Sequence, residues 1–88
     1  MANSPSARKR ALQSEKNRQR NRAYRSRMHT AVKQLREAIE TQDSVKARLL
    51  LPDTLSIVDA TAAKGVIHRN TAARTKSRLA RAVDALES

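Results

Sequence analysis

The side chains of this sequence that are best suited to binding a ligand are the cations. Nine of the 19 Lys and Arg residues fall between residues 8 and 27, where the only acid is Glu15. Thirteen of the 19 are Arg, whose planar guanidinium donates paired hydrogen bonds to phosphate oxygens and stacks on bases. A segment with so few acids cannot neutralise itself, so we expect it to bind a polyanion.

Residues that catalyse reactions or hold metals are scarce. The chain has no Cys, and its two His residues lie 39 positions apart without HExxH-type spacing, which argues against zinc. One Gly cannot build a glycine-rich phosphate loop, and 88 residues leave little core to enclose a pocket of about 300 Å³. We therefore predict a binding protein that is not an enzyme and uses no metal, cofactor or small-molecule substrate.

Composition favours a small all-α fold. Gly and Pro total three, and no long alternation of Val, Ile, Thr or aromatic residues indicates a strand. Fifteen Ala let helices approach closely, whereas Leu, Ile and Val total only 16, so the core should be thin. We predict a three-helix bundle with a long, projecting basic N-terminal helix. No apolar run approaches the ~20 residues that span a bilayer, and the basic start is unlike a secretory signal, so we expect no membrane association.

The first helix should run from about residue 5 to 41, with Ser4 as its N-cap and Pro5 at its first position. At 100° per residue its C-terminal half has one apolar face, formed by Tyr24, Met28, Ala31, Val32, Leu35, Ala38 and Ile39. Towards the N-terminus the same face turns polar, with Asn21, Asn17, Ser14, Gln13 and Arg10. We therefore predict that the helix leaves its own domain near residue 22 and is covered there by a partner.

Cations form two rows on this helix. One row contains Arg18, Arg22, Arg25, His29 and Arg36, and the other, nearly opposite, contains Lys9, Lys16, Arg20 and Arg27. Two opposed rows suit insertion between phosphate backbones better than contact with a single surface.

A second helix is expected from about residue 43 to 64, capped by Asp43 and kinked or broken near Pro52. Its apolar stripe should consist of Leu51, Leu55, Val58 and Ala62, extended by Val45 and Leu49. Gly65 should end it in a left-handed conformation.

The third helix, about residues 70 to 87, should pack through Ala72, Leu79, Val83 and Leu86. Its other side should present Arg74, Arg78 and Arg81 with Asn70 and Ser77. That side is predicted to contact RNA.

An alternative partner is duplex DNA. Asn17 to Arg27 resembles the basic region of a leucine zipper, and an architectural DNA-binding protein would carry similar charge. A zipper needs three or four heptads after the basic region, but the series from Leu35 continues with Gln42 and Leu49 and then meets Pro52. Charge alone does not distinguish RNA from DNA.

The run from Asp59 to Ala80 closely resembles the signature of the bacterial small-subunit ribosomal protein twenty family, KG-x-IH-x-N-x-AAR-x-KSRL. It is matched at Lys64, Gly65, Ile67, His68, Asn70, Ala72, Ala73, Arg74, Lys76, Ser77, Arg78 and Leu79. The opening MAN, followed by Ser6, Ala7, Lys9, Arg10, Glu15, Arg18, Asn21, Arg25, Ser26 and Met28, is also similar to that family. Pro5 and His29 depart from it, because basic residues are common there.

The resemblance implies a single ribosomal RNA-binding domain over residues 1 to 88 and a structural role in the small subunit. The implied partner is small-subunit (16S-type) ribosomal RNA, bound directly during assembly, by a monomer with few or no protein neighbours in the cytoplasmic ribosome. The expected RNA contacts are Arg8, Lys9, Arg10, Gln13, Lys16, Asn17, Arg18, Arg20, Asn21, Arg22, Arg25, Arg27, Lys64, His68, Arg69, Asn70, Arg74, Lys76, Ser77 and Arg78.

Overall fold

Three α-helices make up the described part of the chain. The computed structural model describes residues 5–86, and within that range α1 spans Pro5–Glu40, α2 spans Ser44–Ala63 and α3 spans Arg69–Asp84, with no strand. The predicted all-α class is therefore confirmed. The N-cap expected at Ser4 lies outside the described residues.

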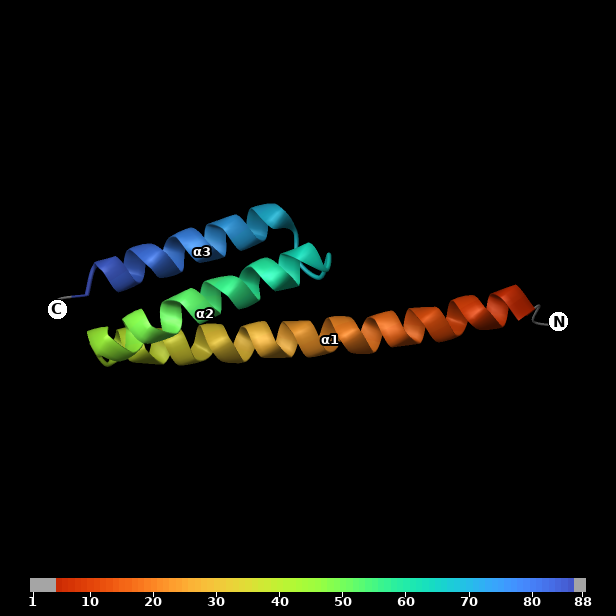
Figure 1. Ribbon diagram of the computed structural model, residues 1–88, viewed down its shortest axis with the longest axis horizontal. Helices are drawn as coiled ribbons and strands as arrows, with labels where there is room; N and C mark the ends of the chain where they lie inside the picture. Colours follow the sequence, from red (N-terminus) through yellow and green to blue (C-terminus); the bar gives the residue numbers. More distant parts are fainter. Residues whose placement is uncertain (1–4, 87–88) are drawn as a thin grey trace.

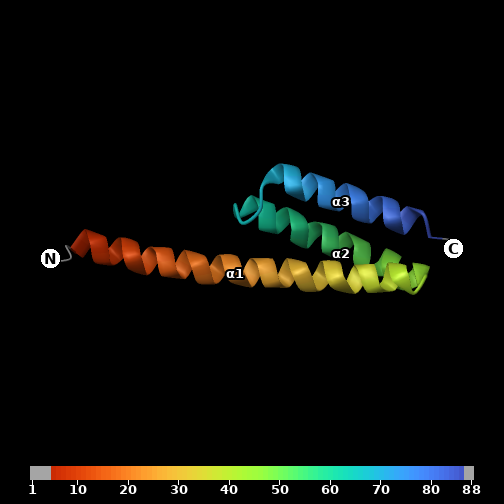
Figure 2. The ribbon, with the colours of Figure 1, turned by 180° about the vertical axis from the view of Figure 1, so that it is seen from behind.

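The helices run side by side in alternating directions, and α2 lies between α1 and α3 (Figures 1 and 2). α1, with 36 residues, is by far the longest, and its N-terminal half continues alone beyond the other two helices (Figure 1). The molecule is accordingly elongated, with principal extents of 65 × 20 × 16 Å. The prediction of a helical bundle with a projecting first helix is confirmed.

The apolar face predicted for the C-terminal half of α1 packs inside the bundle. Leu35 and Ala38 are buried, and Tyr24, Met28, Ala31, Val32 and Ile39 are half-buried. The main core cluster joins all three helices and consists of Leu35, Ala38, Ala47, Leu79, Val83 and Leu86. α3 ends at Asp84, earlier than expected, because Leu86 turns into this core and its N–H donates to the Val83 carbonyl.

The stripe predicted for α2 is wrong at its N-terminal end. Val45 and Leu49 are exposed, with 70% and 72% of their surface accessible. Thr54 and Thr61 are buried instead, because each hydroxyl donates to the carbonyl one turn earlier, at 2.9 Å to Leu50 and 2.7 Å to Ile57. A satisfied threonine hydroxyl can be buried at little cost, and its small side chain lets neighbouring helices approach.

α2 continues through Pro52, so the expectation of a break there is wrong. Pro52 itself is exposed, while Ala47 before it and Val58 after it are completely buried. Both halves of α2 are therefore held by packing, which offsets the hydrogen bond that the proline ring removes. A kink at Pro52 remains a prediction.

Both turns between helices use the same backbone motif. After α2, the Val66 N–H donates to Thr61 and the Gly65 N–H to Ala62, and Gly65 has φ = 75°. After α1, the Asp43 N–H donates to Ala38 and the Gln42 N–H to Ile39, and Gln42 has φ = 60°. These are Schellman motifs, so the left-handed ending predicted at Gly65 is confirmed.

Candidate nucleic-acid interface

The N-terminal half of α1 has no protein surface to pack against. Residues 6–20 are all exposed, and we call this segment the arm; Asn21 is the first half-buried residue after it. Tyr24 lines one shallow hollow together with Ala60 of α2, and α2 ends only three residues later at Ala63. Because the two helices run in opposite directions, α2 cannot cover α1 before about residue 21. The predicted departure near residue 22 is therefore confirmed.

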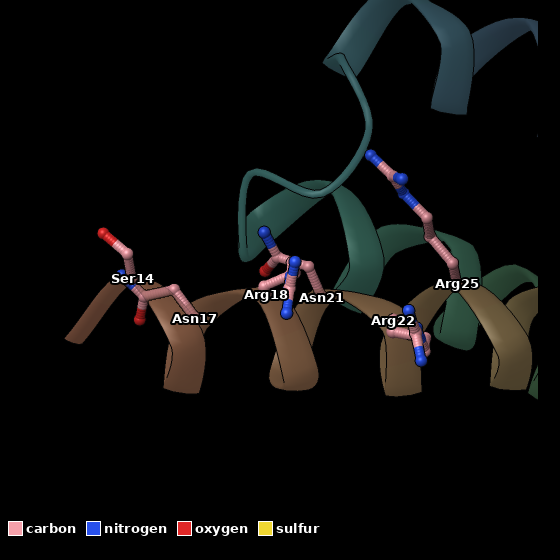
Figure 3. A pocket seen from close by; sticks show the side chains of 6 residues that line it. All are labelled: Ser14, Asn17, Arg18, Asn21, Arg22 and Arg25. Atoms are coloured by element: carbon pink, nitrogen blue, oxygen red, sulfur yellow. The ribbon is translucent and has the colours of Figure 1, made fainter. Parts of the chain in front are cut away.

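One open hollow of about 520 Å³ lies along this stretch of α1 (Figure 3). Its lining contains both uncharged polar and cationic side chains and consists of Ser14, Asn17, Arg18, Asn21, Arg22 and Arg25. Arg25 extends towards the turn between α2 and α3 (Figure 3). Arginine donors spaced three or four residues apart can reach successive phosphates along one strand.

Glu15 is the acid of the arm, and it binds two neighbours. Its carboxylate accepts from Arg18 Nη2 at 2.6 Å and from Gln19 Nε2 at 3.3 Å. The Arg18 and Glu15 side chains are 70% and 48% exposed, so water screens the ion pair and Arg18 can exchange this partner for a phosphate. The arm therefore keeps most of its positive charge for a ligand.

Asn21 is the residue of the hollow whose hydrogen-bonding capacity is left unsatisfied by the protein. Its Oδ1 atom is buried without a hydrogen-bond partner, and no other side-chain polar atom in the described residues is in that state. An unsatisfied buried acceptor costs about 1–3 kcal/mol. Such an atom calls for an explanation, and its position among arginines indicates a functional one.

A second group of predicted contacts lies at the α2–α3 turn and on the outer side of α3. Lys64, His68, Arg69, Asn70, Arg74 and Arg78 are all exposed there. His68 is the N-cap of α3, and its Nδ1 accepts from the Asn70 N–H at 3.0 Å, so its proton lies on Nε2. The side chain thus holds the start of the basic helix in place and keeps one N–H donor.

Two predicted contacts on α3 already have protein partners. Lys76 Nζ lies 2.7 Å from Asp59 Oδ1 of α2, and Ser77 Oγ accepts from Arg81 Nη2 at 3.0 Å. Both residues are half-buried. In this arrangement Lys76 joins α3 to α2, and part of its charge is offset by the carboxylate. The spacing of residues within α3 could not reveal a partner on another helix.

The basic row on α1 extends further than the expected contacts. Arg22, Arg25, His29 and Lys33 line a second hollow with Ser26 and Thr30, and all six are exposed. His29 and Lys33 were left out of the expected contacts, which on the first helix ended at Arg27. The sequence had already placed His29 in one basic row, and Lys33 follows it by four residues on the same side of the helix.

The described part of the chain offers neither a metal cluster nor a membrane-spanning helix. Between residues 5 and 86, no three His, Cys, Asp or Glu side chains gather where a metal ion could be held. None of the three described helices is long and apolar enough to cross a bilayer.

Comparison with known proteins gives a consistent result. The family described as Ribosomal protein S20 matches residues 2–84. The chain is 49% identical over 86 residues to small ribosomal subunit protein bS20 of Desulfatibacillum aliphaticivorans, covering 98% of each chain. It is 50% identical to the bS20 protein of Thioalkalivibrio sulfidiphilus over 98% of this chain and 100% of that protein. It is also 47% identical to that of Burkholderia cenocepacia over 100% of this chain and 98% of that protein. The chain belongs to the ribosomal protein S20 family.

Proposed function

We propose that this protein is a structural constituent of the small ribosomal subunit, in the cytoplasmic ribosome, and binds small-subunit ribosomal RNA directly. The observation that carries the proposal is the arm, a helical segment rich in cations whose every side chain from residue 6 to 20 is exposed. Protein does not cover it, and its charge suits RNA phosphates. Membership of the family supports the same role and a non-enzymatic function.

In mechanism, the protein neutralises phosphates where RNA helices converge and so lowers the repulsion that opposes their packing. Two features support contact with more than one RNA helix. The rows on opposite sides of the arm, represented by Arg18 and Arg20, face in different directions, because α1 is a continuous helix. Arg74 and Arg78 on α3 form a further exposed surface, separated from the arm by α2. The residues expected from the sequence are the proposed contacts, and His29 and Lys33 join them.

A dimeric leucine-zipper-like role fits the structure poorly. The segment after the basic region would have to pair with a second copy, but its apolar face is used within the chain, where Leu35 is completely buried. α1 ends at Glu40 and α2 returns along it, so no further heptad follows on the same helix. The protein therefore acts as a monomer in its complex with RNA.

Few protein neighbours are expected around it. Among the described residues, the large apolar side chains that are strongly exposed are Leu12, Val45 and Leu49. Stable protein–protein interfaces need a larger apolar centre. The exposed surface of the described residues is therefore better suited to binding nucleic acid than to a permanent interface with another protein.

The test measures affinity of the full chain for small-subunit ribosomal RNA as a function of salt. If six to ten phosphates are contacted, affinity should fall about 10³ to 10⁵-fold between roughly 50 and 200 mM salt. The protein should also remain with purified small subunits through a moderate salt wash. An affinity independent of salt would disprove phosphate neutralisation, and equal affinity for duplex DNA and ribosomal RNA would favour an architectural DNA-binding role.

A further inference from the structure

Charge explains why the hollow on α1 attracts a polyanion, but it does not explain the amides and hydroxyl in its lining. Phosphate oxygens only accept hydrogen bonds, so arginine donors alone would suffice to hold them. Ser14, Asn17 and Asn21 can accept as well as donate. Their presence among arginines indicates a ligand that offers hydrogen-bond donors beside its phosphates.

These three polar side chains lie on one side of α1. They are spaced by three and four residues, which places them within about 60° of one another around the helix. Arg18, Arg22 and Arg25 line the same hollow (Figure 3). A strand lying along the hollow would meet arginines and uncharged polar groups interspersed, and its own backbone offers both phosphates and sugars.

Asn21 supplies the strongest sign of a missing donor. Its Oδ1 is buried and unpaired in the structure, although the side chain as a whole is only half-buried and lines the open hollow. On binding, the amide would have to turn so that this oxygen faces the hollow, where a ligand donor can pair with it. A phosphate cannot do this, because it has no proton to donate at neutral pH.

We propose that the Ser14–Asn17–Asn21 side of α1 recognises ribose 2′-hydroxyl groups, with Asn21 accepting from one of them, and thereby makes the hollow selective for RNA over DNA. The 2′-hydroxyl is the donor that RNA places beside every phosphate and that DNA lacks. Exocyclic amino groups and ring N–H groups of bases are the other donors of RNA, and the experiment separates them from the 2′-hydroxyl. This inference rests on the proposed RNA-binding function and adds to it a reason for the choice of nucleic acid.

The test uses the full chain and small-subunit ribosomal RNA transcribed with a small fraction of 2′-deoxy phosphorothioate nucleotides. Bound and unbound RNA are separated, and iodine cleavage shows the positions at which 2′-deoxy substitution weakens binding; ordinary phosphorothioate nucleotides provide the background. A parallel transcript with inosine phosphorothioate removes guanine amino groups. The wild-type chain is compared with Asn21→Ala and with Gln19→Ala.

Gln19→Ala is the matched control, because Gln19 is an exposed amide of the arm that does not line the hollow and binds Glu15 instead. We expect at least one 2′-deoxy interference that disappears with Asn21→Ala and persists with Gln19→Ala. Asn21→Ala should lower affinity for this RNA about tenfold, leave its dependence on salt unchanged and leave affinity for duplex DNA unchanged. Circular dichroism should show unaltered helix content.

The inference is overturned if no 2′-deoxy interference depends on Asn21, or if the interference that depends on Asn21 occurs only with inosine. Both results would leave RNA binding by the wild-type chain intact, so the proposed function would stand. Loss of binding by the wild-type chain itself would overturn both.

Discussion

The two halves of α1 share one backbone conformation and differ in everything that surrounds it. Leu35 in the C-terminal half is completely buried, whereas Leu12 in the arm is 65% exposed. The apolar face that packs on α2 and α3 becomes a face of Asn, Ser and Arg in the N-terminal half, without an interruption of the helix. One helix is thus core in one half and exposed in the other, where we propose that it binds RNA, and the side chains alone decide between the two.

The largest expected effect is a loss of RNA affinity when the arginines of the hollow on α1 are removed, without a loss of stability in the bundle. Replacing Arg18, Arg22 and Arg25 together by Ala removes three charged donors, each worth about 1.5 kcal/mol or more, so affinity for small-subunit ribosomal RNA should fall about 10³-fold. The salt dependence should become less steep by about two to three units in the logarithmic plot. The melting temperature should not fall, since these side chains are exposed and Ala favours helix.

Filter binding over a range of salt concentrations measures both quantities for this triple variant. Lys46→Ala is the control, because Lys46 is an exposed cation on α2, within the segment of residues 37–63 that carries more acids than bases. It should change neither the affinity nor the slope. A triple variant with wild-type affinity would contradict the proposal that the hollow on α1 binds RNA.

The next prediction compares the stability of the two halves of α1 by making a Leu→Ala substitution in each of them. Leu35→Ala should lower the free energy of unfolding by about 3 kcal/mol, because it leaves a cavity in the cluster that joins all three helices. Leu12→Ala should change it by less than about 0.5 kcal/mol, since the side chain is mostly exposed. Urea unfolding followed by circular dichroism measures both. Equal losses would show that the arm is packed on protein in solution.

A smaller effect is expected at the second basic surface. Arg74→Ala combined with Arg78→Ala should weaken binding to ribosomal RNA about 10²-fold, less than the triple variant because two donors are removed. Helicity should be nearly unchanged, as both side chains are exposed.

Lys76→Ala provides the contrast on the same helix. It breaks the ion pair with Asp59 between α3 and α2, which is partly exposed, so it should lower stability by less than about 1 kcal/mol. Its effect on RNA affinity should be smaller than that of either neighbouring arginine. The opposite order would mean that Lys76 leaves Asp59 altogether and contacts RNA at least as strongly as Arg74 and Arg78 do.

Sequence patterns predicted the parts of this fold that depend on one helix at a time. The apolar face of α1 and the left-handed Gly65 follow from periodicity and from backbone preference. The stripe of α2 was misjudged, because hydrophobicity ranks Val45 above Thr54, whereas packing of three helices buries the threonine and satisfies its hydroxyl locally. Of the kink or break expected at Pro52, the break is excluded for a similar reason, since burial on both sides holds the helix together.

The candidate site was predictable in outline but not in its pairings. Exposed cations at helical spacing mark the surface, and 17 of the 20 expected contacts are exposed, the half-buried ones being Asn21, Lys76 and Ser77. What spacing cannot give is a partner from another helix, as for Lys76 and Asp59, or the state of a single atom, as for Asn21. Those depend on how the helices are placed relative to one another.

The last expected effect concerns stability alone and compares the two turns of the bundle. Gly65 and Gln42 occupy the same left-handed position of a Schellman motif, with φ of 75° and 60°. A Cβ added at Gly65 would meet no atom within 4 Å, so Gly65→Ala should lose about 1 kcal/mol of stability through the backbone conformation alone. Gln42→Gly relieves the same strain but raises the conformational entropy of the unfolded chain. The free energy of unfolding should therefore rise by only about 0.5 kcal/mol. Urea unfolding resolves the opposite signs, and both variants should bind RNA as the wild type does. A loss of stability in Gln42→Gly would mean that the Gln42 side chain stabilises the turn by more than its backbone strain.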